Sequence, residues 1–176
     1  MAESDRTSSI ARSVGASHVP HRTISRAPTQ TAALAHLIAA HLGARDVVLL
    51  IGDLGTGKTT FTQALAVALG IDEPVTSPTF TIMRHYTTRY QGTLLHIDAY
   101  RLRGPAELHD LGIDELLDDG AMAVIEWGDI VAAAVGPEHL DIHLNWVDET
   151  VREIRVEPHG ERWRDVVSPE SEEREQ

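Results

Sequence analysis

The sequence that decides the fold runs from Val47 to Thr60 and reads VVLLI GDLGTGKT T. Its first five residues form a continuous apolar run, which is typical of a strand buried on both faces of a parallel sheet. Residues 52–59 match the pattern G-x-x-x-x-G-K-[ST] at every fixed position. Residues 59–69 then carry apolar side chains at helical spacing, and Gly70 ends that pattern. A buried strand, a glycine-rich loop and a helix in this order predict a P-loop that binds a nucleotide.

Each residue type in this loop suits contact with the triphosphate of ATP. Glycine lets the backbone curl so that successive N–H groups point at phosphate oxygens, and the start of the helix adds further donors. We expect Lys58 to bridge the β- and γ-phosphates, the Thr59 hydroxyl to hold Mg²⁺, and Thr60 to reach the α-phosphate. Among the 15 Lys and Arg residues of the chain, Lys58 is the only Lys. The expected nucleotide contacts in the loop are Asp53, Leu54, Gly55, Thr56, Gly57, Lys58, Thr59 and Thr60.

P-loop enzymes need a second acid near Mg²⁺, at the end of a neighbouring strand. Two acids have the right setting, because Asp98 follows the apolar run 94–97 and Glu126 follows the apolar run 122–125. One would hold the metal or its water shell while the other polarises the attacking water, and the sequence does not rank them. Either acid also fits an ordinary exposed residue at a strand end or a helix N-cap. The predicted catalytic residues are therefore Lys58, Asp98 and Glu126, and the predicted metal ligands are Thr59, Glu126 and Asp98.

A loop rich in hydroxyl groups, Ser77-Pro78-Thr79, lies between the P-loop helix and Asp98. Proline holds the preceding residue extended. Thr79 on such a loop would contact the γ-phosphate or Mg²⁺, as a switch loop does. The alternative is an ordinary turn rich in Ser and Thr.

The rest of the chain predicts an α/β protein with the three-layer P-loop NTPase fold. We expect a mostly parallel central sheet with added antiparallel hairpin strands. Residues 1–25 are predicted to be a disordered N-terminal leader, residues 26–165 the P-loop ATPase domain, and residues 166–176 an acidic C-terminal tail. Within the domain, the patterns predict helices at 32–42, 59–69, 105–111 and 129–135, a turn at 113–117, hairpin strands at 80–88 and 93–97, a buried strand at 122–125, and a closing antiparallel pair at 140–144 and 151–156.

Composition limits the classes of partner. The formal net charge is −12, with no cysteine and no apolar run long enough to span a membrane. The body of the chain lacks the clustered Lys and Arg that binding to a polyanion needs. If the protein serves a nucleic-acid pathway, we expect it to do so through a protein partner. A cytoplasmic location fits these features.

Two other motifs are weak. Asn145-Trp-Val-Asp148 is similar to the guanine-reading N-K-x-D pattern, but it lacks the Lys and lies in a strand pattern. His139 and His143 lie on one face of a predicted strand, and the sequence offers no third ligand that would complete a zinc site with them.

The motifs taken together resemble those of the TsaE (YjeE) family of small bacterial ATPases. Beside the P-loop, the similar segments are Ser77-Pro-Thr-Phe-Thr81, His96-Ile-Asp-Ala-Tyr-Arg-Leu102, Glu107-Leu, Leu111-Gly-Ile-Asp-Glu-Leu116 and Val124-Ile-Glu-Trp127, in this order and spacing. The resemblance covers roughly residues 28–157. The combination is more specific than the P-loop alone.

The resemblance implies an ATPase needed to form threonylcarbamoyl adenosine at position 37 of tRNA. It implies partners, namely a threonylcarbamoyl-transferring subunit and the dimeric partner of that subunit. By the motif, Thr59 and Glu126 serve Mg²⁺, Asp98 is needed for hydrolysis, Trp127 lies beside the nucleotide, and Thr31 lies near the adenine end. The segment around Thr31 departs from the acid-rich one usual in the family. The runner-up function is a P-loop kinase acting on a small metabolite, and a non-hydrolysing nucleotide-gated module is the third.

Overall fold

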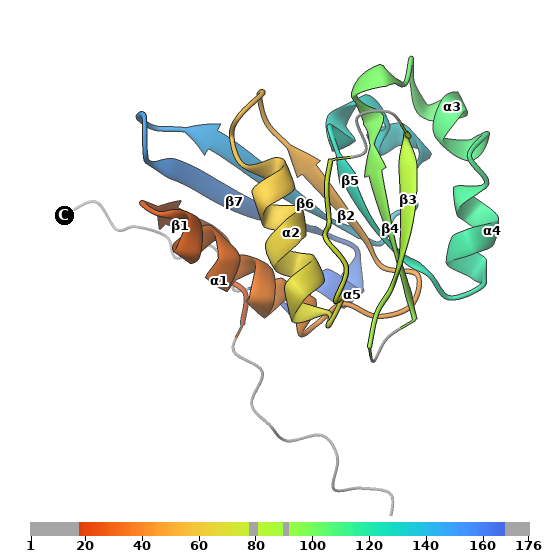
Figure 1. The fold of residues 1–176 in the computed structure, drawn as a ribbon, viewed down its shortest axis with the longest axis horizontal. Helices are drawn as coiled ribbons and strands as arrows, with labels where there is room; N and C mark the ends of the chain where they lie inside the picture. The colour runs from red at the N-terminus through yellow and green to blue at the C-terminus, as the bar shows by residue number, and fades with distance from the viewer. Residues whose placement is uncertain (1–17, 78–80, 90–91, 168–176) are drawn as a thin grey trace, which may run out of the picture.

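The fold is an α/β sandwich around one mixed sheet (Figure 1). The computed structural model describes residues 18–77, 81–89 and 92–167. The strands within those residues are β1 Arg22–Ser25, β2 Val47–Ile51, β3 Met83–Thr87, β4 Thr93–Asp98, β5 Met122–Glu126, β6 His139–Trp146 and β7 Arg152–His159. The helices are α1 Pro28–Ala39, α2 Lys58–Ala68, α3 Pro105–His109, α4 Ile113–Asp118 and α5 Glu161–Arg164, with 3-10 turns at Ala99–Arg101, Gly128–Ile130 and Ala132–Ala134.

The sheet has a parallel centre and antiparallel edges, as the sequence predicts. Over the described residues the strand order is β1-β7-β6-β2-β5-β4-β3. Strands β6, β2, β5 and β4 are parallel to one another, whereas β1, β7 and β3 run antiparallel to their neighbours. The predicted hairpin at 80–97 and the predicted closing pair at 140–156 are both confirmed. The parallel centre brings the carboxyl ends of β2, β4 and β5 to one edge of the sheet.

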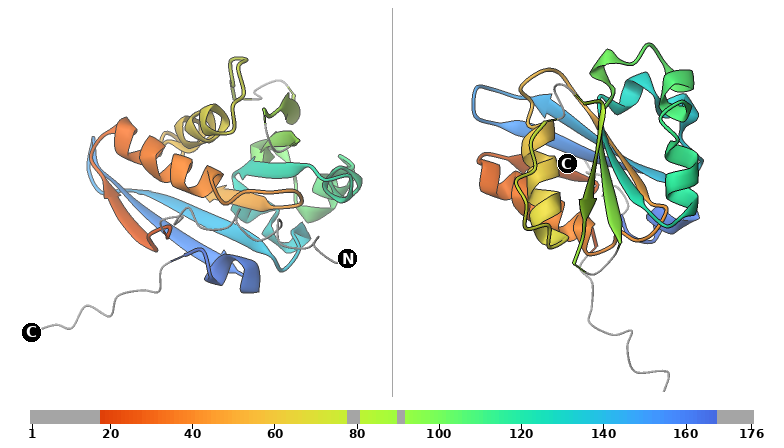
Figure 2. Two further views of the ribbon diagram at one scale, coloured as in Figure 1. Left: turned by 90° about the horizontal axis from the view of Figure 1, so that it is seen from below. Right: turned by 45° about the vertical axis from the view of Figure 1, so that its right-hand side comes forward.

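Helices cover both faces of the sheet, which gives three layers (Figure 2). On one face, α1 and α2 pack with Phe61 and Leu65 against Val48 and Leu50 of β2. On the other face, α3, α4 and the 3-10 turns pack against Leu49 and the neighbouring strands. The first four residues of β2 are buried on alternate faces, so the continuous apolar run seen in the sequence serves two cores at once.

Four sequence predictions need correction. Residues 18–25 are not part of a disordered leader, because Arg22–Ser25 pairs with β7 and Val19 forms a bridge with Val167. This pairing needs a partner far along the chain, so local composition does not reveal it. Val167, predicted to lie in the acidic tail, is buried. Residues 113–117, predicted as a turn, lie in helix α4, and the predicted helix at 129–135 is two short 3-10 turns. Residues 1–17 and 168–176 lie outside the described residues.

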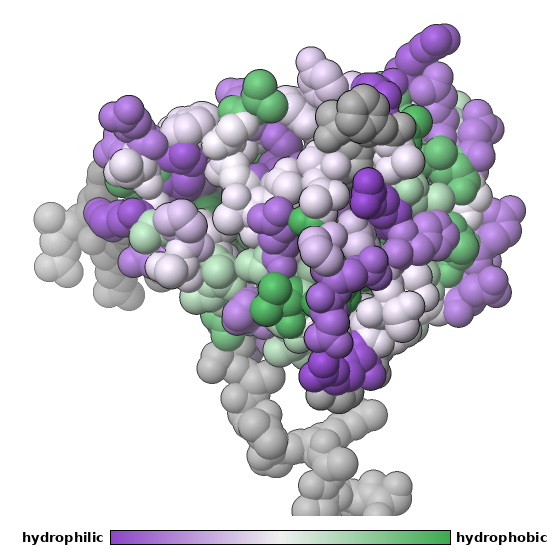
Figure 3. Space-filling model, in the orientation of Figure 1, coloured by the Kyte–Doolittle hydropathy of each residue, from purple (hydrophilic) through white to green (hydrophobic). Residues whose placement is uncertain are grey.

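The surface is mixed in character. In Figure 3, hydrophobic residues lie in small separate groups among hydrophilic ones. Within the described residues, no helix is long and apolar enough to cross a membrane.

Candidate nucleotide site

The candidate site forms where three parallel strands end. The P-loop follows β2, Asp98 ends β4, and Glu126 ends β5. Asp98 and Glu126 are direct partners in the register of β4 and β5, and Glu126 also pairs with Leu50 of β2. The two acids that the sequence left unranked therefore lie side by side next to the P-loop.

Two glycines determine the backbone path of the loop. Gly52 has φ +150°, and a Cβ at this position would collide with the carbonyl oxygen of Leu144. Gly57 takes a left-handed conformation, with φ +107°, immediately before α2. Thr56 Oγ1 donates a 2.9 Å hydrogen bond to the Asp53 carbonyl, which closes the loop on itself. Because α2 begins at Lys58, the unpaired N–H groups of its first turn face the loop, as an anion site requires.

Lys58 is held inside the site by three contacts. Its Nζ donates to the carbonyl oxygens of Gly52 at 2.6 Å and Asp53 at 2.8 Å. The ammonium also lies 3.8 Å from the centre of the Trp127 ring, a cation–π contact. Burial lowers the pKa of Lys58 below its usual value, while the surrounding carboxylates, first of all Glu126, act in the opposite direction. A triphosphate placed beside this ammonium would stabilise the charged form that burial disfavours.

Glu126 is the centre of a buried polar cluster. The Thr59 hydroxyl donates to its Oε2 at 2.9 Å, and His96 Nε2 lies 2.9 Å from its Oε1. Thr62 Oγ1 lies 3.5 Å from the same Oε1. Glu126 is 3% exposed and His96 is fully buried. The carboxylate is thus fixed toward the first turn of α2, where the Thr59 hydroxyl is expected to meet Mg²⁺.

Asp98 stands at the open side of the same cluster. Its Oδ1 accepts a 3.1 Å bond from the backbone N–H of Tyr100, and its Oδ2 lies 3.4 Å from Ser77 Oγ. Trp127 follows Glu126 with φ +59°, a left-handed conformation that is uncommon for a residue with a side chain. This turn sends the Trp127 ring back against Tyr100, at a centroid distance of 4.9 Å. The strained backbone therefore places an aromatic wall beside Lys58.

These side chains enclose a cavity of about 250 Å³. Nine of the residues predicted from the sequence line it, together with Ser77. The lining consists of Leu54, Gly55, Gly57, Lys58, Thr59, Thr60, Ser77, Asp98, Glu126 and Trp127. Thr79, predicted to contact the γ-phosphate or Mg²⁺, lies outside the described residues.

Thr31 lies in a second hollow on the other side of the P-loop. The two hollows share Gly55, Gly57 and Thr60, so they are continuous around the loop. Thr31 lies within α1 and not ahead of the helix as predicted, and its hydroxyl lies 2.8 Å from that of Ser25. The remaining lining is Ala27, Pro28, Thr56, Thr150 and Arg152. The placement joins Thr31 to the P-loop in space, on the side away from Asp98 and Glu126.

Four functional candidates were absent from the sequence prediction. His96 and Ser77 support the two acids, while Thr150 and Arg152 line the hollow beside Thr31. The guanidinium of Arg152 stacks 3.3 Å from the centre of the Trp146 ring. A polar His inside the apolar strand LLHID is a signal that could have been used, because a buried polar group needs a partner. Thr150 and Arg152 reach the site only through the pairing of β6 and β7, which local sequence does not show.

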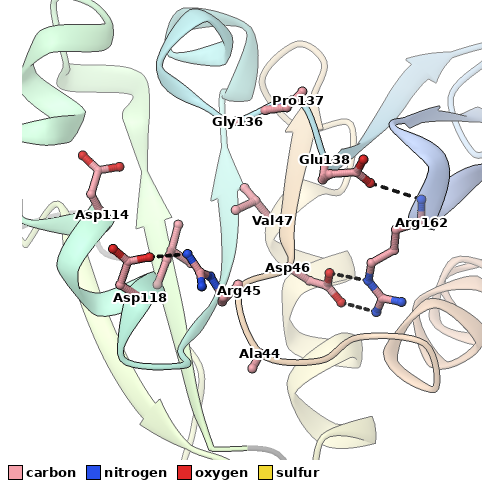
Figure 4. Close-up of a pocket in the computed structure, with 11 residues that line it drawn as sticks. Ala44, Arg45, Asp46, Val47, Asp114, Asp118, Gly136, Pro137, Glu138 and Arg162 are labelled. Atoms are coloured by element: carbon pink, nitrogen blue, oxygen red, sulfur yellow. Dashed lines mark hydrogen bonds and ion pairs between the residues drawn. The ribbon is translucent and has the colours of Figure 1, made fainter.

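A larger hollow of about 500 Å³ lies beside the start of β2, at the other end of that strand from the P-loop (Figure 4). Its charged side chains already pair with one another, as Arg45 does with Asp118 and Arg162 with Asp46. The carboxylate of Glu138 accepts the backbone N–H groups of residues 161 and 162. No glycine-rich loop borders it among the described residues. We therefore place the nucleotide site at the P-loop.

Comparison with known proteins assigns the family. The family model described as "Threonylcarbamoyl adenosine biosynthesis protein TsaE" matches residues 25–154. The chain belongs to the TsaE family. This match confirms the resemblance found in the sequence, and it begins in β1 and ends in β7, so it spans both hollows around the P-loop.

Individual relatives agree with the TsaE assignment. A Bacillus subtilis protein named tRNA threonylcarbamoyladenosine biosynthesis protein TsaE is 39% identical over 142 residues, which is 81% of this chain and 87% of the relative. A Streptomyces coelicolor protein of the same name is 40% identical over 136 residues, covering 74% of this chain and 91% of the relative. The crystal structure of YdiB from Bacillus subtilis superimposes with a TM-score of 0.69 and 33% identity, covering 82% of this chain and 89% of YdiB. The solved structure of YdiB thus supports the predicted α/β fold.

Proposed function

We propose that this chain is a Mg²⁺-dependent ATPase that supports formation of threonylcarbamoyl adenosine at position 37 of tRNA. Its TsaE relatives are named for biosynthesis of that modified nucleoside. The observation that carries the proposal is the 2.9 Å bond between Thr59 and Glu126, next to the buried ammonium of Lys58. It joins the hydroxyl expected at Mg²⁺ to the acid at the end of the neighbouring strand.

The residues at this point fit Mg²⁺. Magnesium prefers oxygen ligands and usually takes only one or two from protein side chains, the rest coming from water and phosphate. The Thr59 hydroxyl and the Glu126 carboxylate supply two such oxygens in direct contact, and Asp98 adds a third group within the same cavity. When bound, Mg²⁺ would neutralise charge on the β- and γ-phosphates. We assign Thr59 and Glu126 to the metal and Asp98 to the side of the attacking water.

Each side chain of the cavity then has its own role in hydrolysis. A water attacks the γ-phosphorus, the bond from that phosphorus to the bridging β–γ oxygen breaks, and ADP leaves. Asp98 orients the water through Oδ2 and takes up its proton, while the N–H of Tyr100 holds the other oxygen in place. Lys58 leaves the carbonyls of Gly52 and Asp53 for the phosphates and offsets the charge of the departing ADP. Trp127 and Tyr100 shield one wall of the cavity from bulk water.

The second hollow is proposed to hold the nucleoside of ATP. It begins where the phosphate cavity ends, at Gly55, Gly57 and Thr60. Thr31 and Ser25 offer hydroxyl groups there, and Arg152 offers a flat cation that a base can stack against. The contacts that we propose for the loop backbone run from Asp53 to Thr60, and Thr79 stays a prediction.

The charge distribution favours action through protein partners. The chain is strongly acidic overall, so direct binding of tRNA lacks the electrostatic contribution that nucleic-acid binders use. We propose that the threonylcarbamoyl transferase subunit and its dimeric partner hold the tRNA, and that this chain acts on them in the cytoplasm. Its own hydrolysis would be slow and would rise when these partners complete the site.

The experiment that tests this proposal follows the γ-phosphate of labelled ATP. The isolated chain is measured with and without Mg²⁺, and then with the two partner proteins added. We expect slow phosphate release that needs Mg²⁺ and increases with the partners. A Glu115→Gln variant, which changes an exposed acid on α4, should behave as the wild type.

The same experiment also distinguishes an ATPase from the alternative function, a small-metabolite kinase. Transfer of the labelled phosphate to a small metabolite, in place of release to water, would contradict the ATPase proposal. The structure gives the kinase no specific support in the described residues. A kinase needs a lid that closes over the phosphates, usually with Arg residues. Arg101 and Arg103 do not line the phosphate cavity, and Arg103 pairs with Glu107 at 3.7 Å.

A further inference from the structure

A second group of polar side chains lies on the β6–β7 hairpin. His139 of β6 is the direct cross-strand partner of His159 of β7. Asp141 lies two residues after His139 and therefore points to the same face of the sheet. Within the described residues, one ligand atom from each of these three side chains lies within 4.8 Å of the other two. The strand pairing itself thus gathers two imidazoles and a carboxylate at one point.

The hydrogen bond of His139 fixes which of its nitrogens carries a proton. Nδ1 lies 2.7 Å from the carbonyl oxygen of Gly136, so it donates its proton there. In the neutral ring, Nε2 then carries a lone pair, and it points at Asp141 Oδ1 from 3.5 Å. That oxygen is buried and has no hydrogen-bond donor among the described residues. Two atoms that each offer a lone pair thus face each other, and a cation between them would satisfy both.

A backbone carbonyl that orients the far nitrogen of a ring is also the usual support of a metal-binding His. His159 completes the group, with Nε2 3.1 Å from Asp141 Oδ2. The two rings are stacked, with centroids 4.2 Å apart and planes 13° apart. The Asp141 carboxylate thus lies within reach of both ring nitrogens.

The distances suit a small tetrahedral ion. Ligand atoms that each lie about 2.1 Å from such an ion are about 3.4 Å from one another. His139 Nε2 lies 3.5 Å from Asp141 Oδ1, and His159 Nε2 lies 3.1 Å from Asp141 Oδ2, so each ring nitrogen is at about this distance from one oxygen of the carboxylate. The His159 side chain is 34% exposed, so water can reach the group and fill a fourth position.

We propose that His139, Asp141 and His159 form a binding site for a divalent transition-metal ion, with Zn²⁺ the best match. Two imidazole nitrogens and a carboxylate oxygen are a donor set that Zn²⁺ accepts. In the sequence, His139 and His143 share a face of a predicted strand, but no third ligand accompanies them. In the structure, His159 lies beside His139 across the hairpin. His143 lies on the same face but pairs with Glu157 at 3.5 Å.

The metal site is separate from the P-loop. Leu140, next to His139, pairs with Val48 near the start of β2, whereas the P-loop follows the end of that strand. An ion bound here would join β6 to β7 at the far end of the sheet. Its expected effect is therefore on the stability of the hairpin, because a ligand that binds only the folded state raises the unfolding temperature.

The test uses the full chain without an affinity tag, stripped with a chelator and kept free of Mg²⁺ and nucleotide. Zn²⁺ is titrated in competition with a chromogenic chelator. We expect one ion per wild-type chain. The variants His139→Ala, Asp141→Asn and His159→Ala should each lose more than the about 10–100-fold affinity that a supporting residue costs. His143→Ala is the matched control and should bind as the wild type. Zn²⁺ should raise the Tm of the wild type and of this control.

Two results would overturn the proposal. One is a wild-type chain that takes up no Zn²⁺. The other is uptake that survives in all three ligand variants and is lost in Glu126→Gln, which would place the ion at the P-loop. If a ligand variant does not fold, the X-ray absorption spectrum of the Zn²⁺-loaded wild type still tests whether the two imidazoles bind the ion. It should show two imidazole ligands, and a spectrum without imidazole would contradict the site.

Discussion

The hydroxyl of Thr59 lies 2.9 Å from the carboxylate of Glu126, which joins the first turn of α2 to the end of β5. We expect Thr59→Ala and Glu126→Gln each to lower the rate of ATP hydrolysis by about 10²-fold or more, because each removes an oxygen from the proposed Mg²⁺ site. ATP affinity without Mg²⁺ should change little. Phosphate release as a function of Mg²⁺ concentration measures the effect.

The control for this pair is Glu115→Gln on α4, which removes an exposed carboxylate outside the cavity. Its Mg²⁺ dependence should match that of the wild type. If Glu126→Gln kept the wild-type rate and Mg²⁺ dependence, the metal assignment would be wrong.

Asp98 is expected to act on the attacking water. The variant Asp98→Asn keeps the shape of the side chain and an oxygen for the N–H of Tyr100, but it removes the proton acceptor. We expect hydrolysis to fall by about 10²-fold or more, as for loss of a general base. The affinity for ATP with Mg²⁺ should stay within a few-fold of the wild type.

Single-turnover hydrolysis with enzyme in excess isolates this step. The control Asp110→Asn changes an exposed acid after α3 and should keep the wild-type rate. An Asp98→Asn variant that hydrolyses ATP at full rate but binds it poorly would indicate that Asp98 binds the metal and does not act on the attacking water.

His96 supports Glu126 from inside the sheet. Its Nε2 lies 2.9 Å from Glu126 Oε1, and both side chains are buried. Removing this partner leaves a buried carboxylate oxygen with only the distant Thr62 hydroxyl, at a cost of about 1–3 kcal/mol. We expect His96→Ala to lower both the free energy of unfolding and the rate of hydrolysis, and His96→Gln to restore part of both.

Urea unfolding and phosphate release, measured on the same variants, distinguish two roles. A merely structural role for His96 would lower stability and leave the Mg²⁺ concentration for half-maximal hydrolysis unchanged. A positioning role moves that concentration upward in His96→Ala and back toward the wild type in His96→Gln.

The sequence predicted the parts of the site that are consecutive or lie at strand ends. The P-loop residues are read from one short motif, and Asp98 and Glu126 each follow an apolar strand. Both acids lie in the cavity with Lys58, because parallel neighbours end at the same edge. The order of these strands in the sheet was not in the sequence, and it is this order that brings the two acids side by side.

What the sequence missed depends on contacts between distant segments. Arg152 enters the hollow beside Thr31 from the β6–β7 hairpin, and strand β1 exists only because β7 offers it a partner. The same hairpin places His159 opposite His139. Helical and strand periodicity describe one segment at a time, so they say which face a side chain takes but not which segment it will meet.

Trp127 offers a direct optical signal for nucleotide binding. The ammonium of Lys58 lies 3.8 Å from the centre of its ring. When Lys58 turns toward the phosphates, the charge over this ring changes, so the fluorescence of Trp127 should change on addition of ATP. A Trp163→Phe variant, which alters a buried tryptophan of α5, should keep that change.

The signal should be lost in Trp127→Phe and should be absent in Lys58→Ala, which also lacks the group that grips the phosphates. Retention of the full change in Trp127→Phe would assign it to Trp146, which lies beside Gly55 on the other side of the loop.

The turn that holds Trp127 depends on close packing at the next residue. A Cβ added to Gly128 would lie 2.5 Å from the Cβ of Leu49, in the buried centre of β2. Leu49 cannot move far, because it is packed on both sides by neighbouring strands. We therefore expect Gly128→Ala to cost about 1–3 kcal/mol of stability through overpacking. It should also shift the ATP-induced fluorescence change, since Trp127 is the preceding residue.

Gly136→Ala is the matched control. Among the described residues, no atom lies within 4 Å of a Cβ added there, and the substitution should change the free energy of unfolding little. Urea unfolding curves of the two variants and the wild type give the comparison. Equal stability of Gly128→Ala and Gly136→Ala would mean that the contact with Leu49 does not constrain the turn. A loss confined to Gly128→Ala would tie the position of the aromatic wall to the packing of the strand that carries the P-loop.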